Sequence, residues 1–292
     1  MNPFRKLQFL TLCAFPLMAG CGASSTPSAG QLPLATDADS VAPGVCTLTR
    51  DGYTLAWVQD NAQPRLMERS LFPAASDSVM QALGLTDGVP STVSTFVLLG
   101  DGGTALFDTG LGLPDSRLQA GIQALGLSPA DVDHIFLTHF HGDHIGGLAP
   151  AGKAAFPRAQ LHVPQREYDA WQAMPPEQRA QVEQALAAYE GRISFFQPAD
   201  TLPLGVQPVE AAGHTPGHTA YRVGPFLIAG DFMHGAALQY AHPDISATYD
   251  MDAAAAARVR RALLSLARGQ GLVLAGMHLP APAMFSFPAS GR

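Results

Sequence analysis

The chain has 292 residues, of which 47% are hydrophobic and 14% are charged, so it can bury a substantial core in one large domain or two small ones. The 17 Lys and Arg residues are outnumbered by 24 Asp and Glu residues, and the sequence has no basic run and no patterned basic face. This charge distribution argues against nucleic acid as a partner.

The first 20 residues are expected to form a secretory signal peptide. Arg5 and Lys6 precede an apolar stretch over residues 7–18, which is too short to be a stable membrane span. Small residues then lead to Cys21. This junction resembles a bacterial lipobox, although Met18 stands where Leu is usual, and ordinary cleavage without lipid is the alternative. We expect export to the periplasm, or anchoring to a bacterial envelope through lipid on Cys21.

Residues 21–45 are predicted to form a flexible tether, because they are rich in small and polar residues and poor in large apolar groups. The folded domain is then expected over residues 46–292. Cys46 is the one cysteine left once the signal is removed and Cys21 is lipidated, so the mature chain has no intramolecular disulfide available.

Apolar periodicity predicts alternating strands and helices after Cys46. A capping box is expected to start a single turn at residues 128–131. The helix over residues 253–268 is expected to stop at Gly269. This alternation predicts an α/β protein of layered type. The expected strands cover residues 93–99, 104–107, 135–138, 206–211, 220–223, 226–229 and 272–275, and the expected helices cover 114–125, 177–190 and 253–268.

One segment concentrates metal-ligating side chains: His139, His141, Asp143 and His144 lie within six residues. Imidazole and carboxylate suit zinc and similar first-row metals. His139 and His141 can point to one position, and the next two residues can turn toward a second position nearby. Four ligands are too few for two metals, so further ligands must come from strand ends downstream. The candidates there are the Gly-His-Thr-Pro-Gly-His turn at 213–218, Asp231 and His278.

These residues resemble the motifs of the metallo-β-lactamase-fold hydrolases. The likeness consists of Thr-His-x-His-x-Asp-His at 138–144, the turn at 213–218, Gly230-Asp231, His278 and Asp108-Thr109-Gly110. The resemblance implies a four-layer αβ/βα sandwich with its metal site at one edge.

Two divalent ions, zinc by default, are implied by the same resemblance. It assigns His139, His141 and His218 to one ion and Asp143, His144 and His278 to the other, with Asp231 bridging them. Asp108 would accept a hydrogen bond from a ligand imidazole. His214 is expected to be a turn residue, because His218 is taken to occupy the ligand position.

Within the family, the sequence is similar to the methyl parathion hydrolase-like branch, which is related to the acyl-homoserine lactonases. His234, three residues after Asp231, matches that branch, whereas the lactonases carry Tyr there. Residues 279–283 read Leu-Pro-Ala-Pro-Ala and depart from the branch pattern. We therefore expect the final strand and one wall of the pocket to be altered or missing.

The resulting hypothesis is a hydrolase of neutral phosphotriester, lactone or ester substrates that uses a metal-bridging hydroxide. Asp143 and His234 are the candidate catalytic residues, and the expected partner is a small-molecule substrate. A β-lactamase is one alternative, and a non-catalytic metal-loaded lipoprotein that binds a ligand is another. No pattern indicates an organic cofactor.

Overall fold

The computed structural model describes residues 32–100 and 102–287. The predicted signal peptide, residues 1–20, and Cys21 lie outside these described residues. Within the described part of the chain, no helix is both long enough and apolar enough to cross a membrane.

The larger of two main sheets has eight strands in the order β1-β2-β3-β6-β7-β8-β9-β10. Neighbours from β1 to β7 are antiparallel, and β7, β8, β9 and β10 are parallel. The strands are β1 Asp39–Ala42, β2 Val45–Arg50, β3 Tyr53–Gln59, β6 Ser94–Gly100, β7 Gly103–Phe107, β8 His134–Phe136, β9 Gln160–Pro164 and β10 Ile193–Phe196.

The smaller sheet has five strands in the order β11-β12-β13-β14-β15. Only β13 and β14 are parallel within it. A separate two-stranded ribbon pairs β4 with β5. The strands are β11 Gln207–Glu210, β12 Thr219–Val223, β13 Phe226–Ile228, β14 Val273–Ala275, β15 Met284–Ser286, β4 Arg65–Met67 and β5 Val89–Ser91.

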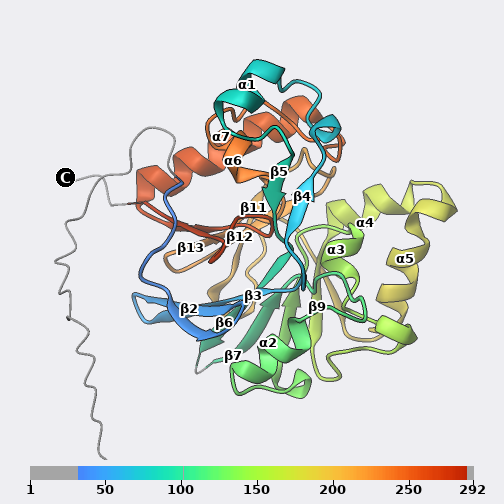
Figure 1. Ribbon diagram of the computed structural model, residues 1–292. Coiled ribbons are helices and arrows are strands. Elements are labelled where there is room, and N and C mark those ends of the chain that lie inside the picture. Colours follow the sequence, from blue (N-terminus) through green and yellow to red (C-terminus); the bar gives the residue numbers. More distant parts are fainter. Residues whose placement is uncertain (1–31, 101, 288–292) are drawn as a thin grey trace, which may run out of the picture.

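The two sheets pack face to face, and helices cover their outer faces (Figure 1). Tyr221 of the smaller sheet stands 5.6 Å, between ring centroids, from both Phe107 and Phe136 of the larger sheet. The predicted four-layer αβ/βα architecture is therefore confirmed. The helices are α1 Asp77–Ala82, α2 Leu118–Ala124, α3 Gly142–Ile145, α4 Gln165–Gln172, α5 Pro176–Ala187, α6 Ala236–Gln239 and α7 Ala253–Gln270, with 3₁₀ turns at Arg69–Leu71, Pro129–Asp131, Pro150–Gly152 and Pro203–Gly205.

The ends of several elements differ from the sequence prediction. The helix expected from residue 114 begins at Leu118, because the buried carboxylate of Asp60 holds the preceding loop through the N–H groups of Leu111 and Leu118. Helix α7 continues past Gly269 and ends at Gln270, and the next residue, Gly271, caps it in the left-handed conformation with φ 63°. The capping box at residues 128–131 is present as predicted.

The structure differs from the sequence expectation at the start of the folded domain and at its final strand. Strand β1 lies inside the expected tether, and Leu34 forms a β-bridge with Phe285, so the ordered domain begins well before Cys46. The final strand, expected to be altered or missing, is present as β15 and pairs with β14. Burial of Met284 and Phe285 in the core accounts for this strand despite its unusual sequence.

Candidate metal centre

The predicted ligands converge on one edge of the sandwich because of where the strands end. The parallel strands β7 and β8 lead into Asp108 and into the loop that carries His139. The parallel strands β13 and β14 lead into Asp231 and His278. Parallel strands end at the same edge of a sheet, so residues far apart in sequence meet there.

The first cluster consists of three buried or half-buried histidines. His139 Nε2 lies 3.1 Å from His141 Nδ1, and His214 Nε2 lies 2.8 Å from His141 Nδ1 and 3.1 Å from His139 Nε2. In a tetrahedral zinc site with Zn–N of about 2.0–2.1 Å, ligand nitrogens stand about 3.3–3.4 Å apart. The three ring nitrogens therefore lie close to the spacing that one ion requires.

Hydrogen bonds to the opposite ring nitrogens show why these histidines need a cation between them. His214 Nδ1 donates to Asp250, 3.0 Å away, which leaves the lone pair on its Nε2. The hydroxyl of Thr138 donates to Asp108, so its oxygen accepts a hydrogen bond from the Nδ1–H of His139. Because the proton of His139 is on Nδ1, its Nε2 also keeps a lone pair. Two lone pairs that face each other at 3.1 Å repel unless a positive ion lies between them.

His218, predicted as a ligand, does not belong to this cluster. Its Nδ1 donates to the carbonyl of Ala211 and its Nε2 accepts the N–H of Asp231, each over 3.1 Å, so both ring nitrogens are used. Gly230 has φ 53°, and a Cβ there would lie 2.4 Å from His218 Nε2. The structure thus corrects the assignment: His214 supplies the third imidazole, and His218 holds the backbone beside Asp231.

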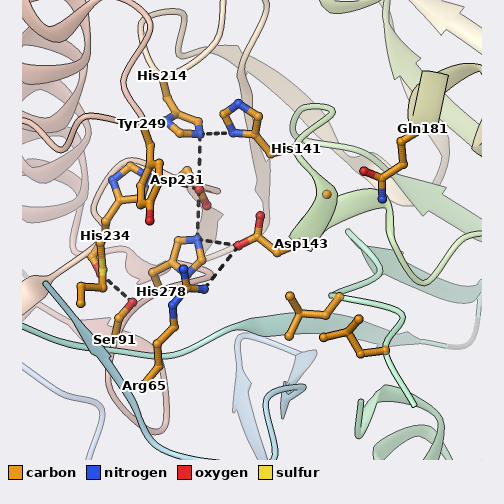
Figure 2. A pocket seen from close by; sticks show the side chains of 14 residues that line it. Arg65, Ser91, His141, Asp143, Gln181, His214, Asp231, His234, Tyr249 and His278 are labelled. Atoms are coloured by element: carbon orange, nitrogen blue, oxygen red, sulfur yellow. Dashed lines mark hydrogen bonds and ion pairs between the residues drawn. The ribbon is translucent and has the colours of Figure 1, made fainter. Parts of the chain in front are cut away.

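The second cluster joins Asp143, His144 and His278. The nearest oxygens of Asp143 lie 3.5 Å from His278 Nε2 and 3.9 Å from His144 Nε2. Asp231 stands between the two clusters (Figure 2). Its Oδ2 is 3.0 Å from His278 Nε2 and 3.4 Å from His214 Nε2, and its Oδ1 is 3.1 Å from His144 Nε2.

Buried polar atoms without a hydrogen-bond partner indicate that these side chains could hold a metal ion. His144 Nε2 and Asp231 Oδ1 are buried and make no hydrogen bond, although they lie 3.1 Å apart. His144 Nδ1 donates to Asp108 over 2.7 Å, so its Nε2, which faces a carboxylate oxygen, is the ring nitrogen available to a proton or a metal ion. The donor sets of both clusters therefore suit divalent cations.

The surroundings set the charges of these groups. Burial lowers the pKa of His141 to about 4 and that of His214 to about 3, which favours the neutral imidazoles that bind metals. Burial also acts to lower the pKa of His144, but the carboxylates of Asp231 and Asp108 outweigh it and raise that pKa well above its usual value. The three-histidine cluster therefore favours neutral rings, whereas the carboxylates around His144 attract positive charge.

Supporting hydrogen bonds orient the ligand rings. The predicted role of Asp108 is confirmed by its bond to His144 Nδ1, and its carboxylate also accepts the N–H and the hydroxyl of Thr138. Sequence reasoning missed the comparable role of Asp250, which orients His214 and is itself bonded to the buried Arg260. An acidic residue near the start of helix α7 was the available signal.

A cavity of about 490 Å³ opens onto the centre, as Figure 2 shows. His234 lines it, and both its ring nitrogens are buried without a hydrogen-bond partner. Its Nε2 lies 3.4 Å from Asp231 Oδ2, and its ring stacks on that of His278. The remaining lining is largely apolar, with polar contacts from Arg65, Ser91 and Gln181 beside Met67, Leu111, Leu113 and Tyr249.

Comparison with known proteins identifies similar chains. The family model described as "Metallo-beta-lactamase superfamily" matches residues 88–278. A probable metallo-hydrolase of Mycobacterium tuberculosis (strain ATCC 25618 / H37Rv) is 32% identical over 42% of this chain and 49% of its own length. A hydroxyacylglutathione hydrolase of Stenotrophomonas maltophilia (strain R551-3) is 28% identical over 45% and 42%. This chain spans about half the length of the curated relatives it matches.

Solved structures share the fold. The hydrolase AbOPH, described as in the beta lactamase superfamily, has a TM-score of 0.75 at 24% identity, over 85% of this chain and 95% of its own. AidC, described as a dizinc quorum-quenching lactonase in complex with a product, has the same TM-score at 22% identity and the same coverage. At this level of identity the likeness establishes a common architecture.

Proposed function

The chain belongs to the metallo-β-lactamase superfamily, and from this we propose that it is a hydrolase of neutral phosphotriester, lactone or ester substrates that uses two divalent metal ions, zinc by default. The observation that carries the proposal is the pair of adjoining donor clusters that share Asp231 and face one cavity. Its support is the chemistry of the donors, since imidazole and carboxylate together favour zinc-like ions.

The clusters divide the ligands between two ions. His139, His141 and His214 would hold one ion, and Asp143, His144 and His278 would hold the other, while Asp231 would contact both. Such ions lower the pKa of water from ~15.7 toward ~7 and polarise a carbonyl or phosphoryl oxygen.

The side chains that face the cavity suit such a reaction. His234 presents an uncommitted imidazole next to Asp231 and can exchange a proton with a leaving group. Asp143 lines the cavity and is partly exposed, and its carboxylate can both ligate a metal and orient a nucleophile. The guanidinium of Arg65 makes no hydrogen bond in the described part of the chain, and its closest carboxylate oxygen is that of Asp143, at 3.9 Å. Its donors are therefore free for phosphoryl or carbonyl oxygens.

The shape and polarity of the cavity support uncharged substrates with an apolar arm. Met67, Leu111, Leu113 and Tyr249 supply apolar surface to the cavity. The description of AidC as a dizinc lactonase supports the same substrate class by analogy of fold.

A substrate panel on metal-reconstituted protein tests the proposal. It comprises aryl phosphotriesters, acyl-homoserine lactones, aryl esters and β-lactams, and product formation is measured for each. We expect turnover in one of the first three classes, and Asp231→Ala should lose both this activity and at least one metal. Asp169→Ala, which changes an exposed carboxylate on α4, should lose neither. Turnover of β-lactams alone, or substrate binding without product, would contradict the proposal.

A further inference from the structure

Glu167 is a fully buried carboxylate on the first turn of α4, outside both donor clusters. No Lys, Arg or His forms an ion pair with it in the described part of the chain, so hydrogen bonds alone compensate its burial. Four donors surround it, two on each oxygen. A carboxylate has about four lone-pair positions, and all of them are used here.

Three of the four donors come from the two loops that carry the three-histidine cluster. Glu167 Oε1 accepts the N–H of Phe140, the residue between His139 and His141, over 3.1 Å. Glu167 Oε2 accepts Thr215 Oγ1 over 2.8 Å and the N–H of Gly217 over 2.9 Å, just beyond His214. One carboxylate thereby joins segments that are about seventy residues apart in the chain.

The same helix also presses directly against both loops. A Cβ on Gly217 would lie 2.1 Å from the backbone nitrogen of Glu167, so the turn leaves no room for a side chain there. Trp171, which donates to Glu167 Oε1 over 2.7 Å, packs edge-on against His141 with ring centroids 5.9 Å apart. Contacts on both sides of the Glu167 carboxylate therefore fix the distance between α4 and the two loops that carry the histidines.

We propose that Glu167 is a positioning residue that holds His139 and His141 at binding distance from His214. The inference rests on the proposed metal centre and assigns Glu167 to one of its two sites. The second site is supported elsewhere, because Asp108 orients His144 and the carbonyl of Thr92 orients His278. Loss of Glu167 should therefore weaken one metal-binding step and spare the other.

The test is a titration of metal-free, full-length protein with Co²⁺, followed by visible absorption. His214→Ala and His278→Ala serve as references that identify which binding step belongs to which site. In Glu167→Gln an NH₂ group replaces one acceptor oxygen and faces two donors. We expect the step that His214→Ala abolishes to weaken about 10- to 100-fold, the range found when a residue that supports a ligand is replaced. The step that His278→Ala abolishes should be unchanged.

Asp169→Asn is the matched control, since it makes the same carboxylate-to-amide change at an exposed position on α4 and should titrate as the parent does. Thr215→Val removes one of the four bonds and keeps Glu167, so it serves if Glu167→Gln does not fold. Its expected effect is a weakening of about threefold or more in the same step.

Three outcomes would overturn the inference. Unchanged affinities in both Glu167→Gln and Thr215→Val would mean that the carboxylate does not position the histidines. Equal weakening of both steps would mean that it supports only the fold. A parent protein that binds no Co²⁺ would remove the proposed metal centre itself, an outcome distinct from the first two because the parent titration alone reveals it.

Discussion

His214 and His218 belong to one turn, yet their ring nitrogens meet different partners. The Nε2 of His214 faces two other imidazoles, whereas His218 is hydrogen-bonded at both nitrogens. A metal ligand needs a free lone pair, and only His214 offers one toward the cluster.

Substitution of these two histidines should separate the two roles. His214→Ala is expected to lose one metal per chain. His218→Ala should retain both metals and lower the free energy of unfolding by about 1–3 kcal/mol, because it leaves the buried N–H of Asp231 and the carbonyl of Ala211 unpaired. Elemental analysis and urea unfolding measure the two effects. Metal loss from His218→Ala together with full occupancy in His214→Ala would restore the original assignment.

His234 is placed to act on the substrate without holding a metal. Its ring nitrogens are unpartnered, and it lines the cavity beside Asp231. We expect His234→Ala to keep both metals and to lower turnover by roughly 10- to 1000-fold, the range for loss of one positioned donor or proton-transfer group. His234→Tyr should shift relative activity from phosphotriesters toward lactones. Release of a metal from His234→Ala would make the residue a ligand instead.

At the scale of an element, the loop before α2 lines part of the cavity, and the buried carboxylate of Asp60 holds it in place. The carboxylate of Asp60 accepts the N–H groups of Leu111 and Leu118 and the hydroxyl of Ser116, over 2.8 to 3.0 Å. Leu111 and Leu113, on the same loop, line the cavity. The order of this loop therefore depends on one buried carboxylate outside the metal centre.

Removing that carboxylate should affect substrate binding more than chemistry. Asp60→Ala is expected to raise KM about 10-fold, equivalent to about 1.4 kcal/mol of lost binding, with kcat and metal content close to those of the parent. Steady-state kinetics on the best substrate of the panel provide the measurement. Asp115→Ala, an exposed change in the same loop, is the control. A fall in kcat with unchanged KM would instead tie the loop to the chemical step.

At the scale of the whole molecule, the metals should contribute to stability, because the folded chain gathers lone pairs and carboxylates that an ion would neutralise. A ligand at 100 times its Kd stabilises by about 2.7 kcal/mol, and 1 kcal/mol shifts Tm by about 2–4 °C at this chain size. Chelation is therefore expected to lower Tm by about 5–10 °C, and zinc should restore it. A Tm that neither chelation nor zinc changes would contradict the proposed metal centre.

The whole chain includes residues beyond the described domain, and we propose that Cys21 carries a lipid anchor. An apolar segment and small residues precede it, as in bacterial lipoprotein signals. Cys21→Ser should move the protein from the membrane fraction to the soluble fraction of envelope preparations. Mass spectrometry that finds an unmodified mature N-terminus at another position would rule out the anchor and leave export as a separate question.

The sequence by itself determined the features that depend on neighbouring residues. The density of ligands at residues 138–144, the period of the apolar residues and the capping box at 128–131 are local patterns. Local patterns persist because backbone geometry fixes the relations between nearby side chains. Asp108 and His278 could be placed because each follows the end of a recognisable strand.

Only the tertiary structure decided which of two histidines in one turn faces the metal centre, and which buried groups hold the ligands. The lone pair of an imidazole points away from whichever partner accepts its N–H. For His214 that partner is Asp250, 36 residues away, and for His218 it is the carbonyl of Ala211. Glu167 likewise looks in sequence like an ordinary helical glutamate, and its role arises because packing buries it between two distant loops. These hydrogen bonds depend on which strand ends lie together at the sheet edge, and no local sequence pattern predicts that arrangement.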